Sequence, residues 1–157
     1  MAPLSKSASQ FLEIHKLTGL IKAIKIFDRE LVENLRVSIY VKDKGYPPLS
    51  ATVTLLLNIV DVNDERPEFS QNNYVFYVME KRPPGLEVGR VQVTDADSGP
   101  NGKFRLDIQH TENNDETGDM FTIDSTTGVI RTAAILSRRN ESEDCYKFTI
   151  VATDGKS

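Results

Sequence analysis

The sequence contains no tryptophan, one cysteine and two histidines. A single cysteine excludes an internal disulfide framework and any zinc site built on cysteine. Cys145 lies in a run of alternating apolar and polar residues, which is typical of a strand position. His15 and His110 each lie in a polar stretch, so neither is an evident partner for a cysteine nucleophile.

Long apolar runs are also missing. No run approaches the roughly 20 residues that cross a bilayer, and residues 1–10 lack the apolar core of a secretory signal. We therefore expect residues 1–10 to be a non-homologous leader, and we find no export signal or membrane anchor within the 157 residues. The net charge of −4 and the lack of a basic run argue against nucleic-acid binding.

The chain repeats itself with a period of one domain. Residues 12–22 resemble residues 121–131, and the resemblance places Gly19 on Gly128. Further along, Asp43 falls on Asp154 with almost the same separation. Such a separation is the length of a whole domain rather than of a short repeat unit. The sequence is thus a window across two tandem domains.

Short alternating segments separated by turn residues predict an all-β fold. Residues 51–60 place Val53, Leu55 and Leu57 at period two, as in a half-buried strand. Further strands are predicted at 74–80, 88–94, 104–109, 120–123, 129–132 and 146–153. Gly- and Pro-containing turns between them favour an antiparallel Greek-key β-sandwich in each domain.

Acidic residues gather where the predicted strands end. The loops of a sandwich collect at its two ends, so acids from both domains and the connector can converge. Seven like charges in one place repel strongly unless a cation lies among them. These carboxylates are Asp28, Glu30, Asp61, Asp64, Asp95, Asp97 and Asp154.

The candidate ligands offer oxygen and nothing else. Oxygen-only sets select Ca²⁺ or Mg²⁺, and the mixture of carboxylates, Asn and backbone carbonyls suits Ca²⁺ better. The stretch from Asp95 to Asn101 superficially resembles an EF-hand loop. Pro100 and Leu106 stand where that loop needs Gly and Glu, which excludes it.

These motifs together resemble the signatures of cadherin repeats. They are Asp-Val-Asn-Asp followed by Pro-Glu-Phe (61–69), Asp-Arg-Glu (28–30), Asp-Ala-Asp with Asn-Gly (95–102), Ala-Thr-Asp-Gly (152–155) and Ser-Thr-Thr-Gly-Val-Ile (125–130). The resemblance implies the C-terminal part of a first repeat at 11–60, a calcium-binding linker at 61–68, and a second repeat at 69–157 without its final strand.

The resemblance also implies three calcium ions at the junction. The ion nearest the second repeat would take Asn63, the Glu65 carbonyl, Asp95, Asp97, the Asn101 carbonyl and Asp154. The middle ion would take Glu30, Asp61, the Val62 carbonyl, Asp64 and Asp97, and the outer ion Asp28, Glu30 and Asp64. The family expects a further glutamate from the first strand of the leading repeat, which this sequence does not contain, so two of the sites are expected to be incomplete.

The function implied is calcium-dependent cell–cell adhesion. Calcium would stiffen the junction, the partners would be other cadherin-type ectodomains in homophilic or heterophilic contact, and the parent protein would act on the extracellular side of the plasma membrane. Asn140 begins an Asn-Glu-Ser acceptor for N-glycosylation, giving a glycoprotein if exported.

Two alternatives stay open. One is a truncated, non-adhesive fragment or isoform that binds calcium weakly or not at all, with exposed sheet edges. The other is an enzyme with paired carboxylates, such as a glycoside hydrolase; the lack of tryptophan and of aromatic residues beside the acids argues against it.

Overall fold

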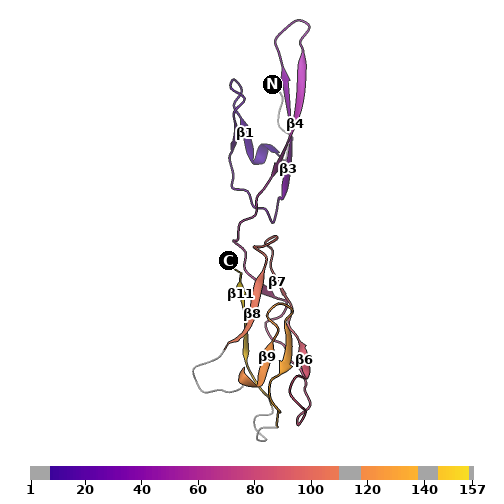
Figure 1. The fold of residues 1–157 in the computed structure, drawn as a ribbon. Coiled ribbons are helices and arrows are strands. Elements are labelled where there is room, and N and C mark those ends of the chain that lie inside the picture. The colour runs from indigo at the N-terminus through magenta and orange to yellow at the C-terminus, as the bar shows by residue number, and fades with distance from the viewer. Residues whose placement is uncertain (1–7, 110–117, 138–144, 156–157) are drawn as a thin grey trace. The chain divides into compact units, whose positions relative to one another are not determined.

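The computed structural model describes residues 8–109, 118–137 and 145–155. The chain divides into two compact units, Met1–Asp61 and Val62–Ser157 (Figure 1). In the described ranges every paired strand is antiparallel, and the helical segments are two short 3₁₀ turns, η1 (Ala8–Gln10) and η2 (Gly118–Met120). No helix described is long and apolar enough to cross a bilayer.

The first unit consists of two hairpins. β1 (Leu12–Ile14) pairs with β2 (Ile21–Ala23), and β3 (Asn34–Lys42) pairs with β4 (Ser50–Asn58) along the full length of both strands. Leu12, Leu35 and Val37 form a small buried core. Phe11 and Phe27 stack beside it with ring centroids 5.4 Å apart. In the described residues the buried positions of β1 and β3 alternate with exposed ones, so one face of each of these strands packs on this core.

Strand β4 confirms the strand predicted at 51–60, displaced by one or two residues at each end. Strand β3 was not predicted. Its buried residues Leu35 and Val37 alternate with polar residues, but Tyr40 and Val41 continue the apolar run and obscure the period. Pairing with β4 along its full length, rather than local pattern alone, defines this strand.

The second unit contains seven strands in the described residues. They are β5 (Glu68–Phe69), β6 (Glu87–Arg90), β7 (Val93–Thr94), β8 (Phe104–Gln109), β9 (Phe121–Ile123), β10 (Val129–Thr132) and β11 (Thr149–Asp154). Strand β10 lies between β6 and β9, β11 pairs with β8, and β5 pairs with β7 (Figure 1).

Apolar residues from these sheets meet in one core. Phe121 stacks on Phe148 with ring centroids 4.8 Å apart and meets Tyr146 edge-on at 5.6 Å. Alternating inward residues at 146, 148, 150 and 152 pack against this core, so β11 and the residues just before it cover it from one side. The residues buried together are Val91, Leu106, Ile108, Phe121, Ile130 and Leu136.

The strands predicted in this unit agree with the structure to different degrees. Those at 104–109, 120–123 and 129–132 are confirmed to within a residue. The prediction at 146–153 is confirmed from Thr149 onward, and the one at 88–94 corresponds to two short strands, β6 and β7.

The strand predicted at 74–80 is wrong. That segment has no strand partner among the described residues. Its alternation is real, because Phe76 and Val78 pack on the core while Tyr77 is exposed. Alternation of apolar and polar residues therefore indicates that one face of this segment is buried, but it does not show that the segment pairs with another strand.

The internal repeat has a matching local structure. Gly19 and Gly128 adopt nearly the same left-handed backbone, with φ of +72° and +71°. Their N–H groups donate to the carbonyls of His15 and Asp124 at 2.9 and 3.0 Å, the same spacing in both units. This backbone favours glycine, which explains why the Thr-Gly pair is the part of the repeat easiest to see in the sequence.

Candidate metal centre

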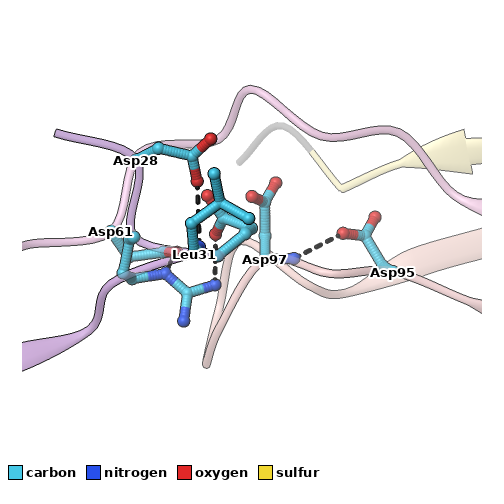
Figure 2. A network of polar contacts seen from close by, with 7 residues as sticks. Asp28, Leu31, Asp61, Asp95 and Asp97 are labelled. Carbon is cyan, nitrogen blue, oxygen red and sulfur yellow. Dashed lines mark hydrogen bonds and ion pairs between the residues drawn. The ribbon is translucent and has the colours of Figure 1, made fainter. Parts of the chain in front are cut away.

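Asp95 and Asp97 lie in the loop that follows β7. The backbone N–H of Asp97 donates to Oδ1 of Asp95 at 3.0 Å, a bond drawn in Figure 2. Asp97 retains only 7% exposure. A carboxylate in that position requires compensating charge or hydrogen bonds, because burying an ionised group alone is costly.

The same loop brings Asp154 to this end of the second unit. Gly102 lies so close to the Asp97 carbonyl that a side chain at 102 would collide with it. The next residue, Lys103, accepts a hydrogen bond from the Gly155 N–H at 2.7 Å, and Asp154 pairs with Phe104 at the end of the β8–β11 ladder. The close approach of Gly102 to Asp97 therefore links the Asp95–Asp97 loop to the end of β11.

The connector reaches the same loop through β5. Glu68 pairs with Thr94, the residue just before Asp95. Upstream, the Asp64 N–H donates to the Val62 carbonyl at 2.9 Å and forms a tight turn around Asn63. A shallow pocket lies where connector and loop meet, and it is lined by Glu65, Arg66, Glu68, Thr94, Asp95 and Ala96.

Three buried side-chain oxygens of the second unit have no hydrogen-bond donor within the described residues. They are Oδ1 of Asn63, Oδ2 of Asp95 and Oδ1 of Asp154. Buried polar atoms are nearly always satisfied, and each orphaned one costs about 1–3 kcal/mol. All three are hard oxygen acceptors, so the donor set fits a cation such as Ca²⁺.

The first unit places its predicted ligands differently. The Leu31 N–H donates to Oδ1 of Asp28 at 3.1 Å, so this carboxylate caps a turn (Figure 2). A carboxylate oxygen of Glu30 lies within 4.8 Å of one of Asp61. Both of these acids contact the guanidinium of Arg29, Glu30 at 2.5 Å and Asp61 through Nε.

Arg29 and its two acids form a cluster in which opposite charges meet. Desolvation lowers the pKa of the Arg29 guanidinium, but attraction to Asp61 and Glu30 and hydrogen bonds to both raise it by more. The net direction of the pKa is upward, so the guanidinium stays charged at any pH at which the protein is folded. Glu30 and Asp61 are thus paired with a cationic side chain of their own unit.

Arg29 is the site residue that sequence reasoning missed. The prediction used the acids of Asp28-Arg29-Glu30 and gave the central arginine no role. The only local signal for Arg29 is its position between two acidic residues. Its contact with Asp61 joins residues far apart in the sequence, so local pattern does not indicate it. Among the other predicted positions, Asn101 donates its N–H to the Ser98 carbonyl at 3.2 Å, and Asn140 lies outside the described residues.

Comparison with known proteins gives a consistent picture. The family model described as "Cadherin domain" matches residues 74–157. "Protocadherin-11 X-linked" of Homo sapiens is 42% identical over 138 residues, which is 88% of this chain and 10% of the relative. "Protein dachsous" of Drosophila melanogaster is 37% identical over 144 residues, 91% of this chain and 4% of the relative.

Solved structures extend the likeness to the fold. The structure "Protocadherin gammaB7 EC3-6 cis-dimer structure" matches with a TM-score of 0.82 and 28% identity, covering 96% of this chain and 36% of that one. The match spans both units, which confirms the predicted fold class. The chain spans about a tenth or less of the length of the curated relatives named above.

Proposed function

This chain belongs to the cadherin family, and from that premise we propose that it is a calcium-dependent adhesion module whose two units are held by shared Ca²⁺. Membership of the family and the likeness to protocadherins support an adhesion-related extracellular role for it. The calcium dependence is our proposal, and so is the division into a partial first repeat (11–60), a linker (61–68) and a second repeat (69–157).

The observation that carries the proposal is the set of orphaned oxygens in the second unit. Asn63, Asp95 and Asp154 each bury an acceptor that has no donor in the described chain. The β5–β7 pairing and the contact of Gly102 with Asp97 bring their segments to one end of the unit, which supports a shared centre. We assign to the same ion Asp97 and the backbone carbonyls of Glu65 and Asn101.

Two further ions would use the acids of the first unit and the linker. Glu30 and Asp61, which already lie close together, would serve with Asp28, Asp64 and the Val62 carbonyl. Arg29 competes with a divalent cation for these acids, because its guanidinium already contacts one carboxylate oxygen of Glu30 and one of Asp61. We therefore expect these sites to bind more weakly than the one in the second unit.

When bound, Ca²⁺ supplies the positive charge that lets ligands from both units and the linker converge. The chain itself then limits bending, because the aspartates and the Asn63 side chain hold the linker against the Asp95–Asp97 loop. Extracellular calcium modules bind at about 10⁻⁴–10⁻³ M, so the sites would be filled outside cells and largely empty in cytosol.

We assign the parent protein to the extracellular side of the plasma membrane, with other cadherin-type ectodomains as its partners in homophilic or heterophilic contact. Asn140 is proposed as a glycosylation acceptor in that setting. A non-adhesive fragment is the second candidate. It is favoured by the many apolar side chains that the first unit exposes, such as Leu17, Ile26 and Leu49, at 92%, 95% and 71%.

Calcium titration of the full chain by calorimetry tests the proposal. We expect saturable binding in the high-micromolar to millimolar range. Asp97→Ala should abolish it or weaken it severely, whereas the matched control Asp107→Ala, on the exposed face of β8, should leave it unchanged. Equal binding by Asp97→Ala and the unsubstituted chain would contradict the assignment, and no binding by either would favour the second candidate.

A further inference from the structure

The turn between β1 and β2 has the same backbone hydrogen bonds as the turn between β9 and β10. The His15 N–H donates to the Leu20 carbonyl at 2.8 Å, and the Asp124 N–H donates to the Val129 carbonyl at 2.9 Å. In both turns the side chain of the first residue also accepts the N–H of the threonine three positions later. The two turns therefore differ in the acceptor, which is an imidazole in the first unit and a carboxylate in the second.

The hydrogen bonds of the first turn define the protonation state of the ring. The backbone nitrogen of Thr18 lies 3.3 Å from Nδ1 of His15. A backbone N–H can only donate, so Nδ1 is an acceptor, and the proton of the neutral ring lies on Nε2. The Thr18 hydroxyl lies 2.8 Å from the same Nδ1 and accepts the Leu20 N–H at 3.4 Å. It is thus the neutral form of His15 that caps this turn.

Protonation removes this acceptor. An imidazolium carries a hydrogen on both ring nitrogens and can only donate, so the Thr18 N–H would face another N–H. The ring could still donate to the Thr18 hydroxyl, but it could no longer accept from Thr18. Histidine ordinarily gains its charge between about pH 8 and pH 5. In the second unit the acceptor is retained there, because the backbone hydrogen bond from Thr127 above all lowers the pKa of Asp124.

The other charged groups around the first turn do not change charge in this range. Glu13, Lys16 and Lys22 belong to the same hairpin, and Glu13 lies opposite Lys22. Glutamate and lysine ordinarily titrate outside pH 5–8. The 3₁₀ turn η1, which packs on β1, consists of Ala, Ser and Gln. The charged residues of β3 are an arginine and a lysine, and β4 has none. Within the described residues, the imidazole is thus the group of this hairpin that responds to mild acid.

From this contrast we propose that the β1–β2 turn is a pH-sensitive element, in which protonation of His15 uncaps the Thr18 N–H and loosens the hairpin. The cap stabilises the turn at neutral and alkaline pH. Its contribution is lost as the pH falls through the range in which histidine becomes charged. Packing adds little to the tip, since Leu17 is 92% exposed. Mild acid therefore loosens the turn of the first unit and leaves the corresponding turn of the second unit intact.

Amide exchange of Thr18, followed by NMR in the full chain from about pH 8 to about pH 5, tests the proposal. Each measured rate is divided by the rate of an unstructured amide at the same pH, which removes the intrinsic effect of pH on exchange. We expect the protection of Thr18 to fall about threefold to tenfold, which corresponds to one hydrogen bond. The protection of Thr127 should stay constant. The ring nitrogen shifts of His15 at the alkaline end should show the Nε2–H tautomer.

Exchange of the capping residue provides the matched variant. His15→Asp gives the first turn the acceptor of the second, so Thr18 should stay protected and lose its dependence on pH in this range. His110→Gln changes the other histidine of the sequence and should respond like the unsubstituted chain. Constant protection of Thr18, a pH response that survives in His15→Asp, or an Nδ1–H tautomer would overturn the proposal. All measurements are made with calcium chelated, so their outcome does not depend on the proposed function.

Discussion

The two units handle their acidic residues in opposite ways. In the first, Glu30 and Asp61 share the guanidinium of Arg29, so the unit itself balances one of their two negative charges. In the second, Asn63, Asp95 and Asp154 bury oxygens that no donor of the described chain reaches. The difference teaches that an acidic motif alone does not identify a metal site. A carboxylate with a partner and one without look the same in sequence, and the latter has the greater need of a cation.

In the repeated Thr-Gly turn, by contrast, different side chains occur in the same local structure. His15 and Asp124 occupy equivalent positions and support the same backbone with different side chains. His15 Nδ1 meets the Thr18 hydroxyl at 2.8 Å, while Asp124 Oδ1 accepts the Thr127 N–H at 2.7 Å. Here the backbone is retained and the electrostatics differ, so the turn is a matter of fold rather than of ligand binding.

The largest predicted effect is a loss of stability on substitution in the core of the second unit. Ile130 is 1% exposed at the centre of the second unit. We expect Ile130→Ala to destabilise that unit by about 2–5 kcal/mol through lost burial and a cavity. Hydrogen exchange read by mass spectrometry should show protection lost in β8, β10 and β11 and retained in β3 and β4. Ile135→Ala, at a 64% exposed position, is the control and should change little. Equal loss of protection in both units would show that they do not unfold separately.

Removing one orphaned ligand should weaken calcium binding strongly. Asp154→Asn keeps the shape of the side chain but removes the charge, and we expect about a 100-fold loss of calcium affinity, equivalent to about 2.7 kcal/mol. Calorimetric titration measures it. Asp107→Asn, on β8 and exposed, is the matched control. An unchanged affinity for Asp154→Asn would remove the distinction drawn between the two units.

Substitution of Arg29 should raise the calcium affinity, whereas substitution of Asp154 should lower it. Arg29→Gln frees Glu30 and Asp61 from a competing cation, so the carboxylates become available to the metal. We expect calcium affinity in the sites of the first unit to rise about fivefold, since water moderates the competition between the two cations. Arg36→Gln on β3 is the control, and calorimetric titration is the measurement. A loss of calcium affinity would mean that Arg29 organises the acids for the metal rather than competing with it.

The smallest effect concerns Asp124. Backbone and side-chain hydrogen bonds from Thr127, and a backbone bond from Thr126, hold the pKa of Asp124 below its ordinary value. A lowered folded-state pKa contributes stability above the unfolded pKa, about 3.9, and that contribution is lost as the pH falls through the folded pKa. In the Asp124→Asn variant the unfolding midpoint should therefore fall less steeply as the pH is lowered from about 5 to about 2. An unaltered acid limb would contradict the role of these bonds.

Much of this could be predicted from the sequence, because the informative features are local. The Thr-Gly turn, the strand at 104–109 and the acids at 95 and 97 follow from backbone preference, period and composition. What could not be predicted depends on distant partners. Residues 74–80 have the period of a strand but no described neighbour to pair with, and the contact of Arg29 to Asp61 joins two positions separated by the whole β3–β4 hairpin. Whether an oxygen is orphaned is likewise a property of the assembled fold.

A crystal structure of the chain grown with calcium, with anomalous data, tests the central claim most directly. The account predicts an anomalous peak with oxygens of Asn63, Asp95 and Asp154 about 2.3–2.6 Å away, the usual range for calcium ligands. It is contradicted if those three oxygens accept hydrogen bonds from the protein and no peak lies beside them.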